Sequence, residues 1–243
     1  MSHRKTLIIL PALNEAGNIA KTVRRIRENV PYADVLVVND GSTDSTRLDA
    51  EAEGAIVVSM PYNVGIGAAV QTGFKFAARH GYDLMARLDG DGQHSADNTM
   101  QLLSLVENDE VDVAIGSRFL GQDDDYGTSF MRRVGISFLS NLLSAITHQK
   151  ITDPTSGFSA YNRRAILLFA EYYPHDYPEP EAVVICHRSG LTMREIPVTF
   201  LPRKHGVSQF TTPSRSAYYM LKVTLAILVN MLRRVPNVPI HEQ

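Results

Sequence analysis

Short runs of valine, isoleucine and leucine recur through the first half of the chain, and segments with helical spacing separate them. Each run is continuous rather than alternating with polar residues, which is typical of strands buried on both faces of a sheet. These runs predict strands at 6–10, 35–39, 55–59, 82–88 and 111–117. The pattern therefore indicates an α/β fold with a mostly parallel central sheet flanked by helices.

Helical periodicity is clear in residues 15–28, where Ile19, Val23 and Ile26 share one face. Similar patterns predict further helices at 64–80, 97–108, 129–147 and 215–234. The last of these has an apolar core from Val223 to Leu232, which is too short to span a bilayer.

The second half of the chain is less regular than the first. Residues 191–200 are predicted to form a strand, whereas residues 171–180 carry three prolines and three tyrosines and are expected to form an ordered loop. The sequence shows no internal repeat and no linker. We therefore predict one domain over residues 1–212, followed by a C-terminal helix and tail over 213–243.

Polar and glycine-rich segments stand at the ends of the predicted strands or just before the following helix, at 11–18, 39–45, 63–69 and 89–94. Because parallel strands end on one edge of a sheet, we expect these segments to converge on a ligand. Gly65 and Gly67 would permit close backbone approach to that ligand. No G-x-G-x-x-G follows the first strand, so the pattern does not predict a dinucleotide site.

Asp89 and Asp91 end a buried strand with two like charges, in the segment D-G-D-G-Q-H. Repulsion and desolvation make this arrangement costly unless a cation lies between the carboxylates. Oxygen ligands at a strand end suit Mg²⁺ or Mn²⁺, which often share their coordination sphere with substrate phosphates. The alternative is an aspartate-rich turn without a metal, because Asp-Gly pairs are common in turns.

Charge is distributed unevenly along the chain, although the net charge is only −2. Residues 1–120 hold 11 basic and 16 acidic side chains, and residues 121–243 hold 13 and 10. An acidic half could bind a cation and a basic half could bind phosphates, or the charges are merely scattered over solvated surfaces. The single cysteine, Cys186, excludes an intramolecular disulfide and is expected to be a buried thiol in a reducing compartment.

Five motifs in order resemble the family 2 glycosyltransferases of the GT-A (Rossmann-like) fold: P-A-L-N-E, V-V-N-D-G-S-T-D, N-V-G-I-G-A-A, D-G-D-G-Q-H and G-S-R-F. The resemblance covers about residues 5–210. Two later motifs, D-P-T-S-G-F and V-T-F-L-P-R-K-H-G-V-S, are similar to the dolichol-phosphate mannose synthase and polyprenyl-phosphate glycosyltransferase branch. Members of that branch move a sugar from a nucleotide diphosphate to a lipid phosphate with inversion.

The resemblance implies a role for each matching residue. The nucleotide sugar would contact Pro11, Leu13, Asn14, Glu15, Asp40 and Gly67. The metal ion, Mg²⁺ or Mn²⁺, and the diphosphate would be held by Asp89, Asp91 and Gln93. The reacting phosphates would lie near Arg118 and Arg132, with Arg203 as a clamp from a closing loop. The acceptor side would be shaped by Asp153, Ser156 and Gly157.

Some features depart from that branch. Asn39 replaces a frequent second aspartate, which leaves a UDP-sugar and a GDP-sugar both open as donor. Gln209 stands where phosphate-acceptor relatives usually have lysine, and no stretch reaches the roughly 18 apolar residues of a membrane span. Two alternatives therefore stay open: transfer to a sugar hydroxyl, with Asp153, Glu179 or Glu181 as base, and a non-catalytic nucleotide-sugar binding module.

Further expectations concern the surroundings of the protein. No nucleic acid partner and no signal peptide are expected, and a cytoplasmic protein at the inner face of a membrane is predicted. The segment 217–234 is predicted to pack on the domain, to form a homo-oligomer contact, or to dock at a membrane interface, directly or through a small membrane partner.

Overall fold

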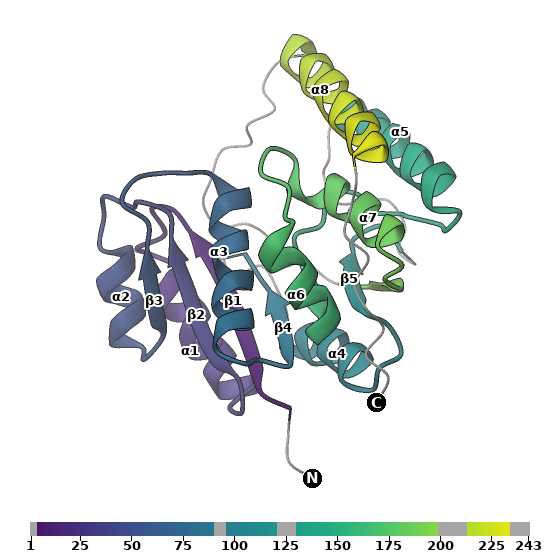
Figure 1. Cartoon of the computed structure of the whole chain (residues 1–243). Coiled ribbons are helices and arrows are strands. Elements are labelled where there is room, and N and C mark those ends of the chain that lie inside the picture. Colours follow the sequence, from purple (N-terminus) through teal and green to yellow (C-terminus); the bar gives the residue numbers. More distant parts are fainter. Residues whose placement is uncertain (1–3, 90–95, 121–129, 199–212, 234–243) are drawn as a thin grey trace.

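The computed structural model describes residues 4–89, 96–120, 130–198 and 213–233. These residues form one seven-stranded sheet in the order β3-β2-β1-β4-β6-β5-β7 (Figure 1). The strands are β1 (Thr6–Ala12), β2 (Asp34–Asn39), β3 (Ile56–Ser59), β4 (Leu84–Arg87), β5 (Val113–Ser117), β6 (Ser159–Tyr161) and β7 (Met193–Pro197). Only β6 runs antiparallel to its neighbours, β4 and β5, so the predicted mostly parallel sheet is confirmed.

Helices cover both faces of this sheet. The helices are α1 (Ile19–Asn29), α2 (Thr46–Ala52), α3 (Ile66–Arg79), α4 (Ala96–Glu107), α5 (Phe130–Thr147), α6 (Arg163–Glu171), α7 (Pro178–Arg188) and α8 (Pro213–Leu232), and α5 and α8 pack against α7 and each other. No helix in the described ranges is both long and apolar enough to cross a membrane.

The two faces of β1 show why continuous apolar runs were needed. Leu7 and Ile9 join a core that includes α3, α6 and α7, whereas Ile8 and Leu10 join a second core that includes α1 and α4. Successive side chains of a strand point to opposite faces, so a strand covered on both sides must be apolar at every position. All four of these side chains are fully buried.

The structure corrects the expectation for residues 171–180. Glu171 is the last residue of α6, and Pro178 and Pro180 lie in the first turn of α7, so only the segment between the two helices is a loop. Proline is favoured at the start of a helix because the first N–H groups have no partner within the helix. The sequence patterns also did not predict α2, α6, α7 or β6 as elements.

Candidate functional site

The loops after β1 and β2 are tied together at the carboxyl edge of the sheet, as expected. The backbone N–H of Asn14 donates to Ser42 Oγ at 2.9 Å, and its side-chain Oδ1 accepts from the N–H of Thr43 at 3.0 Å. Asn14 has a φ of 55°, a left-handed conformation that asparagine tolerates better than most residues. Asn14 therefore fixes the shape of the predicted nucleoside cradle.

Asp40 links the end of β2 to the start of α3. Its carboxylate accepts from the N–H groups of Val64 and Gly65 at 2.8 and 3.0 Å, and the residue is buried. Gly41 beside it has a φ of +72°, and a Cβ there would lie 2.5 Å from the backbone N of Asn63. Both carboxylate oxygens of Asp40 thus organise the loop, and contact with a nucleoside stays a prediction.

The other residues of the predicted nucleotide side differ in what surrounds them. Pro11 is buried in β1, Leu13 is 40% exposed at the edge, and Glu15 accepts from Asn18 Nδ2 at 3.0 Å. A Cβ on Gly67 would lie 2.3 Å from the carbonyl oxygen of His175. The close backbone approach at Gly67 is therefore made by this chain's own loop before α7, and no ligand is needed to explain that glycine.

Asp89 lies just beyond β4, where the sequence predicted the metal site. A Cβ on Gly157 would lie 3.3 Å from Asp89 Oδ1 and 2.9 Å from Arg87 Nη2, so a larger residue at this position would require the two side chains to shift. Asp91 and Gln93 lie outside the described residues. Within the described ranges no group of three or more acidic, histidine or cysteine side chains gathers as a metal site.

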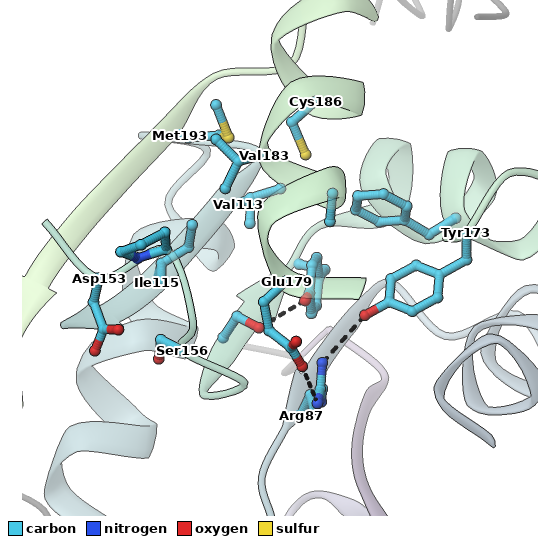
Figure 2. A pocket seen from close by; sticks show the side chains of 15 residues that line it. Arg87, Val113, Ile115, Asp153, Ser156, Tyr173, Glu179, Val183, Cys186 and Met193 are labelled. Carbon is cyan, nitrogen blue, oxygen red and sulfur yellow. Dashed lines mark hydrogen bonds and ion pairs between the residues drawn. The ribbon is translucent and has the colours of Figure 1, made fainter. Parts of the chain in front are cut away.

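A buried arginine, Arg87, is the last residue of β4, two positions before Asp89, and lines the pocket shown in Figure 2. Its Nη2 donates to Glu179 Oε1 at 2.7 Å, and its Nη1 donates to the hydroxyl of Tyr173 at 3.2 Å. Burial alone would lower the pKa of Arg87, but the negative charges of Glu179 and Asp89 more than offset this effect, so the pKa is raised and the guanidinium stays charged. Burial raises the pKa of Tyr173, so that hydroxyl stays neutral and Glu179 supplies the negative charge.

The sequence reading did not single out Arg87, although a signal was available. A lone arginine inside a strand of otherwise apolar residues is rarely buried without a partner. That partner is Glu179, which belongs to the first turn of α7 and not to a solvated loop. The pair joins the strand that carries Asp89 to the helix beside the pocket of Figure 2.

Arg118 and Asp153 form a second ion pair at the same edge. Arg118 donates through Nε and Nη2 to the two oxygens of Asp153 at 2.7 and 2.8 Å, a bidentate geometry. The Asp153 side chain is fully buried, whereas that of Arg118 is 18% exposed. The guanidinium is thus held in place by its inner edge and is partly open to solvent.

The segment D-P-T-S-G-F around Asp153 is fixed by hydrogen bonds to residues of β7 and β5. Glu195 on β7 accepts from the N–H groups of Thr152 and Asp153 at 2.7 and 3.0 Å. Ser156 is buried, and its hydroxyl donates to the carbonyl of Gly116 at 2.6 Å. The structure therefore brings Asp153, Ser156 and Gly157 together with β4 and β5, as the acceptor-side prediction requires. Their contact with an acceptor stays a prediction.

Glu181 lies one turn after the start of α7 and is also buried. It accepts from the N–H of Tyr177 at 3.1 Å and from Asn230 Nδ2 on α8. Burial raises the pKa of Glu181, and the bond from Asn230 offsets only part of that effect. Glu179 and Glu181 therefore both lie on α7 with partners inside the protein, and Glu181 holds α8 onto α7.

The raised pKa of Glu181 makes a testable prediction about stability. The folded state keeps this proton to a higher pH than the unfolded state, so stability falls as pH rises from the ordinary carboxyl pKa through the raised one. Glu181→Gln removes the titration, so its stability relative to the wild type should increase over that range. Urea unfolding between about pH 4 and pH 8 measures this slope. The exposed Glu171→Gln is the control, and parallel curves for Glu181→Gln and the wild type would contradict the prediction.

Two predicted phosphate-binding arginines cannot be placed. Arg132 belongs to the first turn of α5, but its side chain falls outside the described part of the chain, as does the whole of Arg203.

Cys186 is a buried free thiol, as expected, and burial raises its pKa. Asn39 uses its amide internally, accepting from the N–H of Ser42 at 3.1 Å and donating to Ser59 Oγ at 3.2 Å.

Comparison with known proteins agrees with this architecture. A sequence model of the family described as Glycosyl transferase family 2 matches residues 7–168. The chain is 32% identical over 218 residues to the undecaprenyl-phosphate mannosyltransferase of Micrococcus luteus, covering 85% of this chain and 88% of that one. It is 30% identical over 224 residues to the polyprenol monophosphomannose synthase of Mycolicibacterium smegmatis, covering 86% and 82%.

Among solved structures, glucosyl-3-phosphoglycerate synthase from Mycobacterium tuberculosis has the same fold. Its complex with phosphoglyceric acid superposes with a TM-score of 0.70 at 21% identity, covering 93% of this chain and 80% of that one. Another crystal structure of that synthase contains Mn²⁺, UDP-glucose and phosphoglyceric acid. The family match and the two relatives together show that the chain belongs to glycosyl transferase family 2, with the GT-A-like fold of that family.

Proposed function

We propose that this glycosyltransferase moves a sugar, with inversion, from a nucleoside diphosphate sugar to a polyprenyl phosphate. A phosphate oxygen of the acceptor attacks the anomeric carbon, the bond from that carbon to the diphosphate breaks, and the nucleoside diphosphate leaves. The names of the relatives from M. luteus and M. smegmatis support this acceptor class. The donor base and the sugar are left open within this proposal.

The observation that carries the proposal concerns the three carboxylates that could act as a base for a hydroxyl acceptor. All three are engaged in contacts within the protein. Asp153 is held bidentately by Arg118, Glu179 is paired with the buried Arg87, and Glu181 is buried under α8. A general base must be free to reach the proton that it removes. These three are instead committed to structure, which favours an acceptor that needs no base.

A phosphate monoester meets that requirement. Its second pKa is about 6, so it is largely ionised near neutral pH and attacks without losing a proton to the protein. It does need cationic groups to hold it beside an anionic diphosphate. Arg118 suits this role because its fork is fixed by Asp153 and partly exposed, and Arg132 and Arg203 are proposed as further phosphate ligands.

A divalent cation, Mg²⁺ or Mn²⁺, is proposed at Asp89, Asp91 and Gln93. The position of Asp89 at the end of β4, next to the tight Gly157 backbone, fits oxygen ligation at a sheet edge. When bound, such an ion would neutralise charge on the departing diphosphate. The nucleoside is proposed to lie in the cradle built by Asn14, with Asp40 beneath it.

A product screen tests the acceptor. The purified chain is incubated with Mg²⁺ or Mn²⁺, a panel of UDP- and GDP-sugars, and either a short-chain polyprenyl phosphate or the matching polyprenol. We expect transfer to the phosphate and none to the alcohol, because the two differ only in the charged group. Transfer to polyprenol or to a sugar hydroxyl without transfer to the phosphate would overturn the proposal.

A second arm of the screen separates catalysis from simple binding. Release of nucleoside diphosphate in the presence of acceptor is expected for an enzyme, while a non-catalytic binding module would retain the donor unchanged. The ratio of released nucleotide to glycolipid product should be close to one, because each transfer breaks one anomeric bond and forms another. Nucleotide binding without any turnover on the full panel would contradict the enzymatic proposal.

A further inference from the structure

One face of α8 is apolar and exposed. Its members recur every three or four residues along the helix, and each is between 47% and 87% exposed: Tyr218, Leu221, Leu225, Leu228 and Leu232. Such spacing places them in a single stripe on one side of a helix. Scattered exposed leucines are common on proteins, but an uninterrupted stripe of this length marks an interaction surface.

The opposite face of α8 is firmly attached to the protein. Val223 and Ile227 are fully buried in the core, and Asn230 donates to the buried Glu181 of α7. Arg188 at the end of α7 donates to the carbonyl of Asn230 in the last turn of α8 and to that of Arg233 just after it. These contacts fix the rotation of α8 about its axis. Since the side with Val223, Ile227 and Asn230 packs against the protein, the apolar stripe on the opposite side points outward.

The stripe continues onto α5, which lies beside α8 in Figure 1. The two helices meet where a Cβ on Gly135 would lie 3.2 Å from Met220 Sδ. On the outer side of α5, Val134 and Phe138 are 50% and 49% exposed. We define the docking face as Val134, Phe138, Leu221, Leu225, Leu228 and Leu232.

The charged side chains that α5 and α8 themselves carry have one sign. The sequences of α5 and α8 contain four charged residues, Arg132, Arg133, Arg215 and Lys222, and neither helix contains an aspartate or glutamate. Arg133, Lys222 and the neighbouring Arg233 are exposed. An apolar stripe flanked by basic side chains is the pattern of a helix that lies in the interface of an anionic membrane.

We propose that the docking face seats the enzyme on the surface of an anionic lipid bilayer. A second copy of the chain fits less well, because a twofold contact would bring the same basic residues together without a partner of opposite charge. In Figure 1 the pair α5 and α8 lies beyond the end of the sheet toward which β1 runs, the edge that carries Asp89 and Arg118.

The inference rests on the proposed function, which explains why the enzyme would dock on a membrane. The polyprenyl tail of the proposed acceptor stays in the bilayer, so the active site must come to the bilayer surface to reach the acceptor phosphate. Docking through α5 and α8 would bring the carboxyl edge of the sheet to the lipid surface. The probe for docking, however, contains no polyprenyl phosphate, so the two proposals fail separately. The probe is a vesicle of phosphatidylcholine with or without phosphatidylglycerol, tested by co-sedimentation of the full chain.

The full chain should bind the anionic vesicles at low salt, bind pure phosphatidylcholine less, and lose binding as salt is added. Leu221→Ser with Leu225→Ser should reduce the partition coefficient at least tenfold, because both side chains are exposed and leave the core intact. Leu48→Ser on α2, which is 66% exposed and distant from α8, is the matched control and should bind like the wild type. Truncation of α8 is avoided because it would remove the buried Val223 and Ile227.

Three results would overturn the docking proposal. The first is no binding of the wild type to either vesicle at low salt, and the second is a double variant that binds vesicles as well as the wild type. The third is a wild type that is dimeric in solution and a double variant that is monomeric. Sedimentation velocity without lipid measures the last. Transfer to a short-chain, water-soluble polyprenyl phosphate separates the two proposals, because the double variant should match the wild type there. Failure of both proteins in that assay would count against the acceptor, while vesicle binding would still decide the docking face.

Discussion

Glu179→Ala should lower the free energy of unfolding by about 3–5 kcal/mol, because it leaves the buried guanidinium of Arg87 without its hydrogen-bonded counter-ion. The Arg87 side chain is 4% exposed and that of Glu179 is 21% exposed, and their nitrogen and oxygen lie 2.7 Å apart. Tyr173 offers Arg87 only a neutral hydroxyl, so it cannot replace the lost charge. Urea denaturation of the variant and the wild type measures the difference.

The double variant Arg87→Met with Glu179→Met provides the internal test of this explanation. It removes both charges together and fills the space with apolar atoms, so most of the lost stability should return. Glu51→Ala is the surface control, because the Arg47–Glu51 pair on α2 is exposed on both sides and should contribute less than about 1 kcal/mol. A double variant no more stable than Glu179→Ala would show that the buried charge is not the cause.

Most of the N-terminal half of the fold could be predicted from the sequence. β1, β2 and β5 are short apolar runs, and their burial on both faces leaves little room for another interpretation. The boundaries shifted by a few residues, as at α1, which begins at Ile19 because the preceding loop turns through Asn14. The expected convergence of the loops after β1 and β2 is confirmed by direct hydrogen bonds.

The C-terminal half was harder to predict for physical reasons. β6 is only three residues long and runs antiparallel to β4. Its sequence, Ser-Ala-Tyr, also lacks the valine, isoleucine and leucine that are typical of a buried strand. The prolines at 178 and 180 suggested a loop, although at the first turn of a helix they cost no hydrogen bond. The sequence does not predict the Arg87–Glu179 pair, because the two residues are distant along the chain and only the fold brings them together.

Asp89→Asn and Asp91→Asn should each reduce turnover by about three orders of magnitude, since a cation at a departing diphosphate contributes several kcal/mol and 1.36 kcal/mol is tenfold in rate. Asparagine keeps the size of each side chain, so both variants should fold with a melting temperature near that of the wild type. The exposed Asp97→Asn on α4 is the control for the loss of one acidic charge nearby, and its turnover should be unchanged.

A second readout connects this loss to metal and nucleotide rather than to the fold. Two carboxylates leave most of the coordination sphere of Mg²⁺ or Mn²⁺ to water and phosphate, so the cation alone should bind weakly and nucleotide should strengthen its binding. Titration calorimetry with UDP and GDP, with and without Mn²⁺, should show metal-dependent nucleotide binding in the wild type and in Asp97→Asn but not in Asp91→Asn. If Asp91→Asn keeps near-normal turnover, or if the wild type works equally well in EDTA, then the carboxylates at the end of β4 have another purpose. Their repulsion would in that case have to be balanced by Arg87, whose guanidinium already interacts electrostatically with Asp89.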